Sequence, residues 1–441
     1  MALSGLKRNE GTAYPEDSGF LLLVICPQAV YNRMGRDETG KQSCSEKRLC
    51  AEPKRRHWNG REKMEKRKME KLGVEASLLG FGCMRFPVTA EGKINEPLAE
   101  QMIQKAIEAG VNYFDTAYPY HGQKSELFVG KVLEKYDRKS FYLATKLPCW
   151  KVEKLEDVDA VFEEQLEKLR TDYIDFYLMH ALNQERFDAM VNLGVIKRLE
   201  ELKAEGKIRY LGFSFHDKYE VFEKILCYRD WDFCQIQLNY MDVNEQAGLK
   251  GYRLTEEKQI PLIVMEPVKG GSLATFADDI TAKFRGLDAN ASTASFALRW
   301  VGSLPNVKVV LSGMSDMAQV EDNLKTFAEF NPLSQQEQKT IEEVVELINS
   351  RVKSGCTGCR YCMPCPAGVD IPGNFRVWNT YHMYQKYSMV KNNWEKNIGE
   401  EKQAKNCVKC GKCEAACPQK LNIREDLVKV QEDLDKKEFM L

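Results

Sequence analysis

The stretch YFDTAYPYH at Tyr113–His121 gives the clearest indication of the fold. An apolar, β-prone run ends on Asp115, and Tyr120 follows five residues later in a polar turn. Two later segments have the same design, since FYLATK (Phe141–Lys146) ends on a lysine and IDFYLMH (Ile174–His180) ends on a histidine. Each is predicted to be a buried strand that carries one ionisable residue at its carboxyl end.

Segments of this kind alternate with amphipathic helical segments along much of the chain. Eight such units in about 260 residues match the typical size of a closed (β/α)₈ barrel, whose active site lies where the strands end. The alternative is an open doubly wound sheet, but GFGCMR at 80–85 lacks the third glycine of a dinucleotide-binding turn. We therefore predict a TIM barrel in which Asp115, Tyr120, Lys146 and His180 meet in one pocket.

The expected elements follow from the hydrophobic periodicity and from the glycine and proline punctuation. The eight strands are predicted at 77–84, 113–117, 141–146, 174–180, 208–215, 233–240, 261–268 and 307–312. The barrel helices are predicted at 96–109, 125–136, 158–169, 193–205, 245–258, 293–301 and 317–328. Isolated cysteines in these elements are expected to be core or wall residues, because free cysteine behaves as a small hydrophobe; they are Cys83, Cys149, Cys227 and Cys234.

Composition excludes several classes of partner. The 64 Lys and Arg residues nearly cancel the 65 Asp and Glu residues, so we expect neither nucleic acid nor a membrane surface as a partner. No apolar run reaches the ~18 residues of a membrane span. Of the 15 cysteines, eight lie between residues 356 and 417 at metal-site spacing, which is typical of a reducing, cytoplasmic setting.

The last four cysteines have the spacing of bacterial iron–sulfur ferredoxins, Cys407-x₂-Cys410-x₂-Cys413-x₃-Cys417 followed by proline. Structural zinc is the alternative, but it usually takes two well-separated Cys-x₂-Cys pairs. A continuous triplet followed by Cys-Pro therefore favours a [4Fe–4S] cluster.

A similar motif, CTGCRYCMPC at 356–365, comes earlier and is one residue shorter before its last cysteine. In two-cluster ferredoxins the fourth cysteine of each motif binds the other cluster. We therefore assign Cys356, Cys359, Cys362 and Cys417 to one [4Fe–4S] cluster, and Cys365, Cys407, Cys410 and Cys413 to a second.

Four domains or segments are expected. Residues 1–63 are predicted to be a disordered extension, or the product of a start assigned too far upstream. The barrel is expected over 64–332, a linker helix over 333–352 and a small, mainly α-helical ferredoxin-like domain over 353–441. Ser334 and Glu337 have the spacing of a capping box, which predicts the start of the linker helix.

Phe-Asp-Thr-Ala followed by Tyr120, then Thr-Lys at Lys146, then His180 resembles the catalytic pattern of the aldo/keto reductase family. The resemblance implies that Tyr120 donates a proton to the substrate and that His180 orients the substrate carbonyl. A free tyrosine is a poor acid at neutral pH, and a buried ammonium beside it should lower its pKa. Lys146 is the expected ammonium, and Asp115 is expected to hold it in place.

The same resemblance implies an NAD or NADP cofactor and a small carbonyl or alcohol substrate. Phe215 replaces the asparagine usual in the family, so we expect His216 or a main-chain group to take its place. The Lys/Arg pair that commonly holds a 2′-phosphate is absent, and Asp316 would repel such a group. The implied cofactor contacts are Ser214 and Gln235 at the carboxamide, Met265 beside the nicotinamide, Gly270 near the pyrophosphate, and Gly313, Gln319 and Asn323 around the adenosine.

Two hypotheses for function follow. In the first, the chain is an NAD(P)-dependent oxidoreductase. Because a hydride carries two electrons and each cluster carries one, its clusters exchange electrons with an outside ferredoxin or flavoprotein, or have a structural or redox-sensing role. In the second, it is an electron-transfer, redox-sensing or partner-binding protein whose barrel is inactive toward carbonyls. The intact Tyr120, Lys146 and His180 favour the first, whereas Phe215 and Met265 leave the second open.

Overall fold

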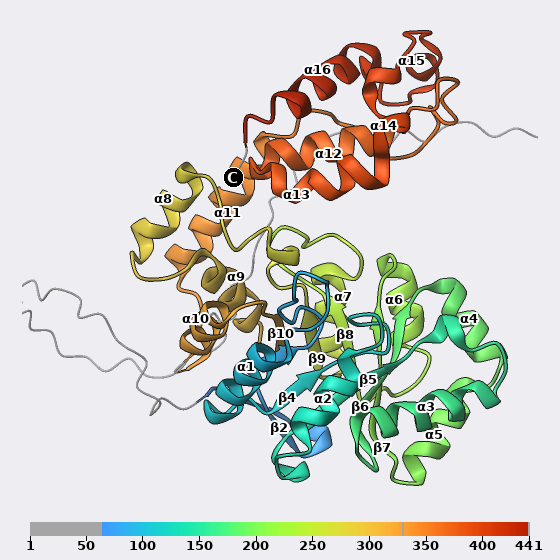
Figure 1. Cartoon of the computed structure of the whole chain (residues 1–441), viewed down its shortest axis with the longest axis vertical. Coiled ribbons are helices and arrows are strands. Elements are labelled where there is room, and N and C mark those ends of the chain that lie inside the picture. Colours follow the sequence, from blue (N-terminus) through green and yellow to red (C-terminus); the bar gives the residue numbers. More distant parts are fainter. Residues whose placement is uncertain (1–63, 329, 440–441) are drawn as a thin grey trace, which may run out of the picture. The chain divides into compact units, whose positions relative to one another are not determined.

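The computed structural model describes residues 64–328 and 330–439 (Figure 1), and the expectation for residues 1–63 lies outside the described residues. Eight parallel strands form a closed barrel in the order β10-β3-β4-β5-β6-β7-β8-β9, which confirms the predicted fold. The strands are β3 (Leu79–Gly82), β4 (Tyr113–Asp115), β5 (Tyr142–Leu147), β6 (Ile174–Leu182), β7 (Ile208–Phe215), β8 (Phe233–Gln237), β9 (Leu262–Met265) and β10 (Val307–Gly313).

The barrel interior is filled by large side chains from alternate strands. Phe176 of β6 makes edge-to-face contacts with Tyr113 of β4 and Phe233 of β8, at centroid separations of 5.0 and 4.9 Å. All three rings are fully buried. The interior is therefore a packed core, and it leaves room for ligands only toward the strand ends.

A hairpin that was not predicted precedes the barrel. Its strands β1 (Lys66–Met69) and β2 (Val74–Ser77) pair antiparallel, and the predicted first strand at 77–84 shortens to β3. Met69 is completely buried and belongs to the same hydrophobic cluster as Tyr113 and Phe176 of the barrel interior. Because Tyr113 opens its strand, the hairpin covers the end of the barrel opposite the predicted active site.

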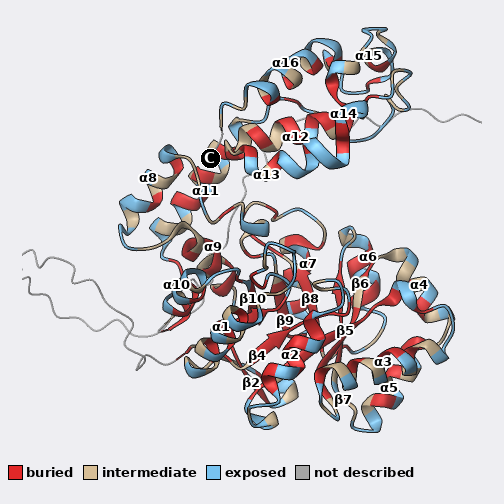
Figure 2. Cartoon of the chain, viewed as in Figure 1, coloured by how far each residue is buried: buried red, intermediate tan, exposed pale blue. Residues whose placement is uncertain are grey.

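Ten helices between residues 96 and 327 accompany the barrel strands. Each buries one side and exposes the other, as the burial colours show (Figure 2). Three of them, α4, α6 and α8, were not predicted, and Cys227, which follows α6, is exposed rather than a core residue. The helices are α1 (Glu96–Glu108), α2 (Ser125–Leu133), α3 (Glu156–Leu169), α4 (Gln184–Asn192), α5 (Val195–Ala204), α6 (Tyr219–Leu226), α7 (Gly248–Glu257), α8 (Asp278–Leu287), α9 (Thr293–Gly302) and α10 (Met317–Phe327).

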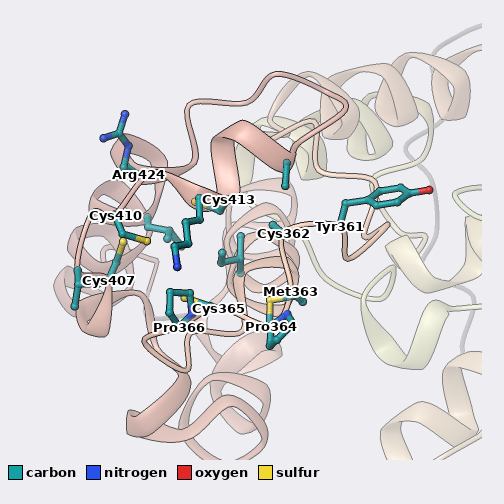
Figure 3. A pocket seen from close by; sticks show the side chains of 15 residues that line it. Tyr361, Cys362, Met363, Pro364, Cys365, Pro366, Cys407, Cys410, Cys413 and Arg424 are labelled. Carbon is teal, nitrogen blue, oxygen red and sulfur yellow. The ribbon is translucent and has the colours of Figure 1, made fainter.

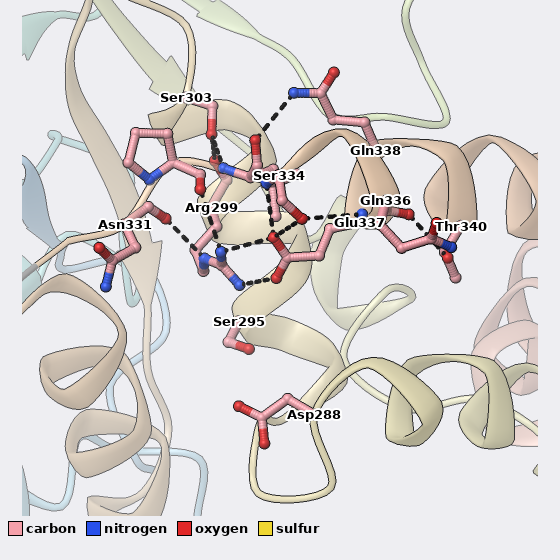
Figure 4. Close-up of polar contacts among 12 residues, drawn as sticks. Asp288, Ser295, Arg299, Ser303, Asn331, Ser334, Gln336, Glu337, Gln338 and Thr340 are labelled. Atoms are coloured by element: carbon pink, nitrogen blue, oxygen red, sulfur yellow. Dashed lines mark hydrogen bonds and ion pairs between the residues drawn. The ribbon is translucent and has the colours of Figure 1, made fainter. Parts of the chain in front are cut away.

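The helix that follows the barrel, α11 (Gln335–Ser350), begins at the expected capping box. Ser334 Oγ accepts a hydrogen bond from the Glu337 amide, and the Glu337 carboxylate accepts one from the Ser334 amide at 2.7 Å (Figure 4). Arg299 of α9 forms an ion pair with the same carboxylate at 2.6 Å. One acidic residue thus both caps α11 and ties it to the barrel.

The C-terminal part is mainly helical, as predicted, and has its own core. Trp378 and His382 on one face of α12 (Ile371–Tyr384) both bond to Asp433 of α16 (Ile423–Lys436), at 2.7 and 2.8 Å. Shorter helices lie between α12 and α16 in the sequence: α13 (Tyr387–Asn392), α14 (Gly399–Lys402) and α15 (Lys412–Ala416). Across the described ranges, no helix is both long and apolar enough to cross a bilayer.

Candidate active site and cysteine cavities

The four predicted catalytic residues line one cavity of about 630 Å³. Asp115 ends β4, Lys146 lies at the end of β5, and His180 lies near the end of β6, which are neighbouring strands of the barrel. Tyr120 reaches the same cavity from the turn after β4. The convergence expected from the strand-end pattern is therefore present in the structure.

Lys146 and Asp115 form the buried floor of this group. The Lys146 ammonium donates to Asp115 Oδ1 at 2.6 Å and to the carbonyl oxygen of Thr116 at 2.8 Å. Burial alone would lower the pKa of Lys146, but attraction to the Asp115 carboxylate and to Tyr120 outweighs it, so the pKa is raised. Lys146 is therefore a fixed cation.

Tyr120 lies over this cation, with its ring centroid 5.3 Å from Lys146 Nζ. Burial raises the pKa of Tyr120, and the Lys146 ammonium offsets only part of that rise. The expected lowering of this pKa is wrong for the structure, because desolvation of the phenolate outweighs the attraction. Tyr120 thus holds its proton at neutral pH, and its role as a proton donor stays a prediction.

His180 completes the group, with its ring 6.2 Å from the Tyr120 ring. Its Nδ1 is buried and has no hydrogen-bond partner among the described residues. Burial, together with the charges of Lys146, His216 and Arg186, lowers the pKa of His180 well below its usual value. The imidazole is therefore neutral at neutral pH and can donate one hydrogen bond to a carbonyl oxygen.

Ser214 and Gln235 lie side by side at the ends of β7 and β8, where their Cα atoms pair in register. Both are buried and line the cavity. Ser214 Oγ accepts the Ala181 amide at 2.8 Å, whereas Gln235 Oε1 is buried with no partner in the described part of the chain. A buried acceptor without a donor fits the amide group of a nicotinamide carboxamide. Met265, at the end of β9, lies 3.5 Å from the Gln235 amide nitrogen and also lines the cavity.

The loop after β9 brings Gly270 and Gly271 to the cavity wall. Their φ angles are +62° and +98°, and a Cβ on either would meet nothing within 4 Å. Glycine is therefore needed here for the left-handed backbone rather than for space. Lys269, just before them, also lines the cavity, and it binds Asp242 at 2.6 Å.

Gly313, Gln319 and Asn323 line the cavity where β10 leads into α10. Gln319 accepts the Ser315 amide and donates to Asp316, each at 2.8 Å. Asn323 donates to Ser312 Oγ at 2.8 Å. These amides hold their own loop in shape, and their contacts to adenosine stay predictions.

The eight motif cysteines gather around two cavities in the C-terminal part. In Figure 3, side chains from both motifs surround one open space, whose volume is about 210 Å³. The other cavity is smaller, about 20 Å³, and the exposed Cys359 lies on it. Cys362, Cys365, Cys407, Cys410 and Cys413 line the larger cavity, and Cys356, Cys359, Cys362 and Cys417 line the smaller one.

This grouping crosses the two motifs as predicted for a two-cluster module. Cys365 lies with the later triplet, and Cys417 lies with the earlier one. Cys362 is the exception, since it lines both cavities. All eight thiols are free of disulfides. No three His, Cys, Asp or Glu side chains within 64–328 and 330–439 converge on a point that could hold a single ion; a four-iron cube is larger and takes its thiolates at its corners.

Comparison with known proteins decides the family. Residues 78–346, more than half of the chain, match the aldo/keto reductase family. The chain belongs to the aldo/keto reductase family. Residues 355–421 match a 4Fe-4S dicluster domain, so this aldo/keto reductase has an iron–sulfur domain after its barrel. Both parts of the resemblance drawn from the sequence are confirmed.

Individual relatives align with this aldo/keto reductase over nearly their whole length. L-galactose dehydrogenase of Arabidopsis thaliana is 26% identical over 306 residues, which are 65% of this chain and 95% of that protein. The uncharacterized oxidoreductase YqkF of Bacillus subtilis is 27% identical over 311 residues, 63% and 96% of the two chains. The solved holo form of an aldo-keto reductase from Bacillus halodurans is 27% identical with a TM-score of 0.54, covering 64% and 96%.

One feature of the site in this aldo/keto reductase agrees with the sequence expectation for Phe215 and His216, and another was not expected. Phe215 is completely buried in the barrel wall, where its ring centroid lies 5.2 Å from that of Phe222. It does not line the cavity, whereas His216 does. Arg85 was not predicted, yet it lines the cavity and lies against Gly313, where a Cβ would come within 2.7 Å of its side chain. Its position after the first strand was the available signal, since every strand end faces the same cavity.

Proposed function

We propose that this aldo/keto reductase is an NAD(P)-dependent enzyme that reduces a carbonyl, or oxidises the corresponding alcohol, by hydride transfer. The observation that carries the proposal is the buried Lys146–Asp115 pair beneath Tyr120, in one cavity with His180. The nicotinamide, when bound, supplies the hydride that adds to the carbonyl carbon.

The protein residues then act on the carbonyl oxygen. The neutral His180 donates a hydrogen bond that orients this oxygen toward Tyr120. The Tyr120 hydroxyl gives its proton to the oxygen as the hydride adds to the carbon, so the product is an alcohol and Tyr120 is left as a phenolate. Lys146 lies close enough to stabilise that phenolate, and Asp115 keeps Lys146 charged and in position.

The cofactor site of the proposal comprises Ser214, Gln235, Met265, Gly270, Gly313, Gln319 and Asn323. The buried acceptor of Gln235 supports a carboxamide-bearing ring at the ends of β7 and β8. Asp316 caps α10 by accepting the Gln319 amide at 2.8 Å. A carboxylate at this loop disfavours a 2′-phosphate, so we expect NADH to serve at least as well as NADPH.

The C-terminal domain is proposed to hold two [4Fe–4S] clusters. Cys356, Cys359, Cys362 and Cys417 would ligate one, and Cys365, Cys407, Cys410 and Cys413 the other. The grouping of the cysteines at two cavities and the dicluster match support this assignment. We propose that the clusters exchange single electrons with an outside ferredoxin or flavoprotein in a reducing cytoplasm. We also propose the domain boundaries: a barrel at 64–332, a linker helix at 333–352 and the cluster domain at 353–441.

A second candidate function is electron transfer or redox sensing without carbonyl chemistry. One observation favours it: Met265 lies beside Gln235, where it can pack against a nicotinamide but cannot stack on it. In that case the protein would bind a cofactor weakly and reduce no carbonyl, although its clusters would accept electrons.

Anaerobically purified protein assayed with a panel of aldehydes and ketones, using NADH and NADPH in turn, tests the proposal. Tyr120→Phe should lower carbonyl reduction by about 10²–10⁴-fold, the usual contribution of a general acid. Tyr228→Phe is the matched control, because Tyr228 is half-exposed and outside the cavity. Full activity in Tyr120→Phe would overturn the acid assignment. Absence of all carbonyl reduction, with clusters that a viologen still reduces, would favour the second function.

A further inference from the structure

Besides Arg85, a second arginine lies near the proposed catalytic centre, and the turn after β6 fixes its position. Arg186, in the first turn of α4, donates from Nη1 to the carbonyl oxygen of Ala181 at 2.7 Å. Its own amide donates to Asn183 Oδ1 at 2.8 Å, which caps the helix. Ala181 has a left-handed φ of +52° and follows His180 directly. The turn after the catalytic histidine thus holds the guanidinium in place.

Trp150 connects this guanidinium to His180. The Arg186 Cζ atom lies 5.4 Å from the centroid of the Trp150 ring, and that ring lies 5.1 Å from the His180 ring. Trp150 is 45% exposed, an unusual exposure for a large apolar ring beside a buried centre. The three side chains form a row that leads from the carbonyl-binding position toward solvent.

Arg186 has no acidic partner within 4.0 Å among the residues that the structure describes, whereas Arg198 of α5 and Arg299 of α9 each have one or more. Two acidic residues, which follow β7 and β9, have other partners. Asp217 accepts the amides of Gln184 and Lys218, at 2.9 and 2.8 Å. Glu266, which lines the cavity, interacts with His216. A half-buried guanidinium with open donors is a ready site for an anion.

We propose that the substrate is an aldehyde or ketone that carries a carboxylate, which binds Arg186 while a flat spacer lies on Trp150. This inference rests on the proposed function and specifies its substrate class. The two separations along the row suit a spacer about as long as one aromatic ring. The planar guanidinium fork matches a carboxylate with two parallel hydrogen bonds, whereas a neutral substituent leaves those donors unpaired.

A matched pair of substrates tests the inference: 4-carboxybenzaldehyde and the methyl ester of the same acid. The wild-type enzyme should show at least tenfold higher kcat/KM for the carboxylate. Arg186→Leu should lower the ratio of the two kcat/KM values by about 10–100-fold, mainly through KM of the carboxylate, since a charge-assisted hydrogen bond contributes a factor of this size. Arg253→Leu removes an equal charge from the exposed surface of α7 and should leave the ratio as it is.

Binding gives a readout that does not need turnover. Calorimetry with 4-carboxybenzaldehyde should show binding to the wild-type protein and a loss of at least tenfold in Arg186→Leu, with Arg186→Lys in between. If both substrates are reduced with equal kcat/KM and Arg186→Leu keeps that equality, the inference is overturned while the proposed function stands. If no carbonyl is reduced, the proposed function fails, and equal binding by the wild type and Arg186→Leu would then overturn the anion site as well.

Discussion

The Lys146 ammonium and the Asp115 carboxylate lie 2.6 Å apart, and their side chains are only 1% and 4% exposed. A charged pair this deeply buried is rarely retained for stability alone, because desolvation of both ions cancels much of their attraction. Its position beneath Tyr120 supports the chemical role that we propose for it, namely to hold positive charge where a phenolate would form.

Replacing the cation should therefore affect chemistry directly. In Lys146→Met, the pKa of Tyr120 should rise further, because burial is no longer offset. Carbonyl reduction should fall by about 10²–10⁴-fold in kcat. Loss of one partner of a buried pair also costs about 3–5 kcal/mol of stability. The unfolding midpoint of the variant is therefore measured together with its reaction rate, to show that the protein is folded. Lys131→Met breaks an exposed ion pair with Glu96 and serves as the control; a folded Lys146→Met enzyme within tenfold of the wild type would contradict the assignment.

His180 should titrate well below an ordinary histidine, since its pKa is lowered in the folded protein. The unfolded chain, with a pKa of about 6.5, then binds the proton more readily. The stability that this group contributes is complete above about pH 6.5 and is lost as the pH falls. Imidazole NMR signals of the wild type and His180→Gln should identify a histidine that stays neutral at pH 6, and His180→Gln should lose less stability between pH 7.5 and 5.5. A His180 signal that titrates at or above 6.5 would refute the burial argument.

The cysteine assignment predicts discrete iron losses. The wild type should contain about eight irons per chain, and Cys410→Ser should contain about four, because each cluster needs its own thiolates. Cys227→Ser is the control, since Cys227 is exposed and lies outside both cavities. Anaerobic iron analysis distinguishes the outcomes, and an unchanged iron content in Cys410→Ser would remove that cysteine from the cluster.

The hairpin should contribute to stability from inside the barrel. Met69→Ala removes a completely buried side chain of the cluster that contains Tyr113, so the free energy of unfolding should fall by about 2–5 kcal/mol. Lys68→Ala, on the exposed side of the same strand, should change it little. Chemical denaturation followed by circular dichroism measures both, and equal effects would mean that the hairpin does not share the barrel core.

Sequence patterns predicted those parts of the site that depend on strand ends. Asp115, Lys146 and His180 each follow a buried run, and in a closed parallel barrel all such positions face one cavity. The β1–β2 hairpin was missed because KRKMEKLGVEAS is rich in charges, and its first strand buries only Met69. Apolar periodicity is weak in so short a pair of strands.

Other features depend on three-dimensional burial, which local patterns do not contain. Desolvation raises the pKa of Tyr120 and attraction to Lys146 lowers it, and the size of both effects depends on how deeply the two side chains are buried. The backbone of Ala181 positions Arg186, and an alanine gives no local signal that its backbone is left-handed.

Cys362 lines both cysteine cavities, so cubes held in them would be near neighbours. An electron placed on one cube then repels an electron approaching the other across a short, poorly screened gap. A potentiometric titration should consequently show the two clusters being reduced at two separate potentials, even though their ligand sets are chemically alike. Such an arrangement stores the first electron more firmly than the second, which leaves the second available for delivery.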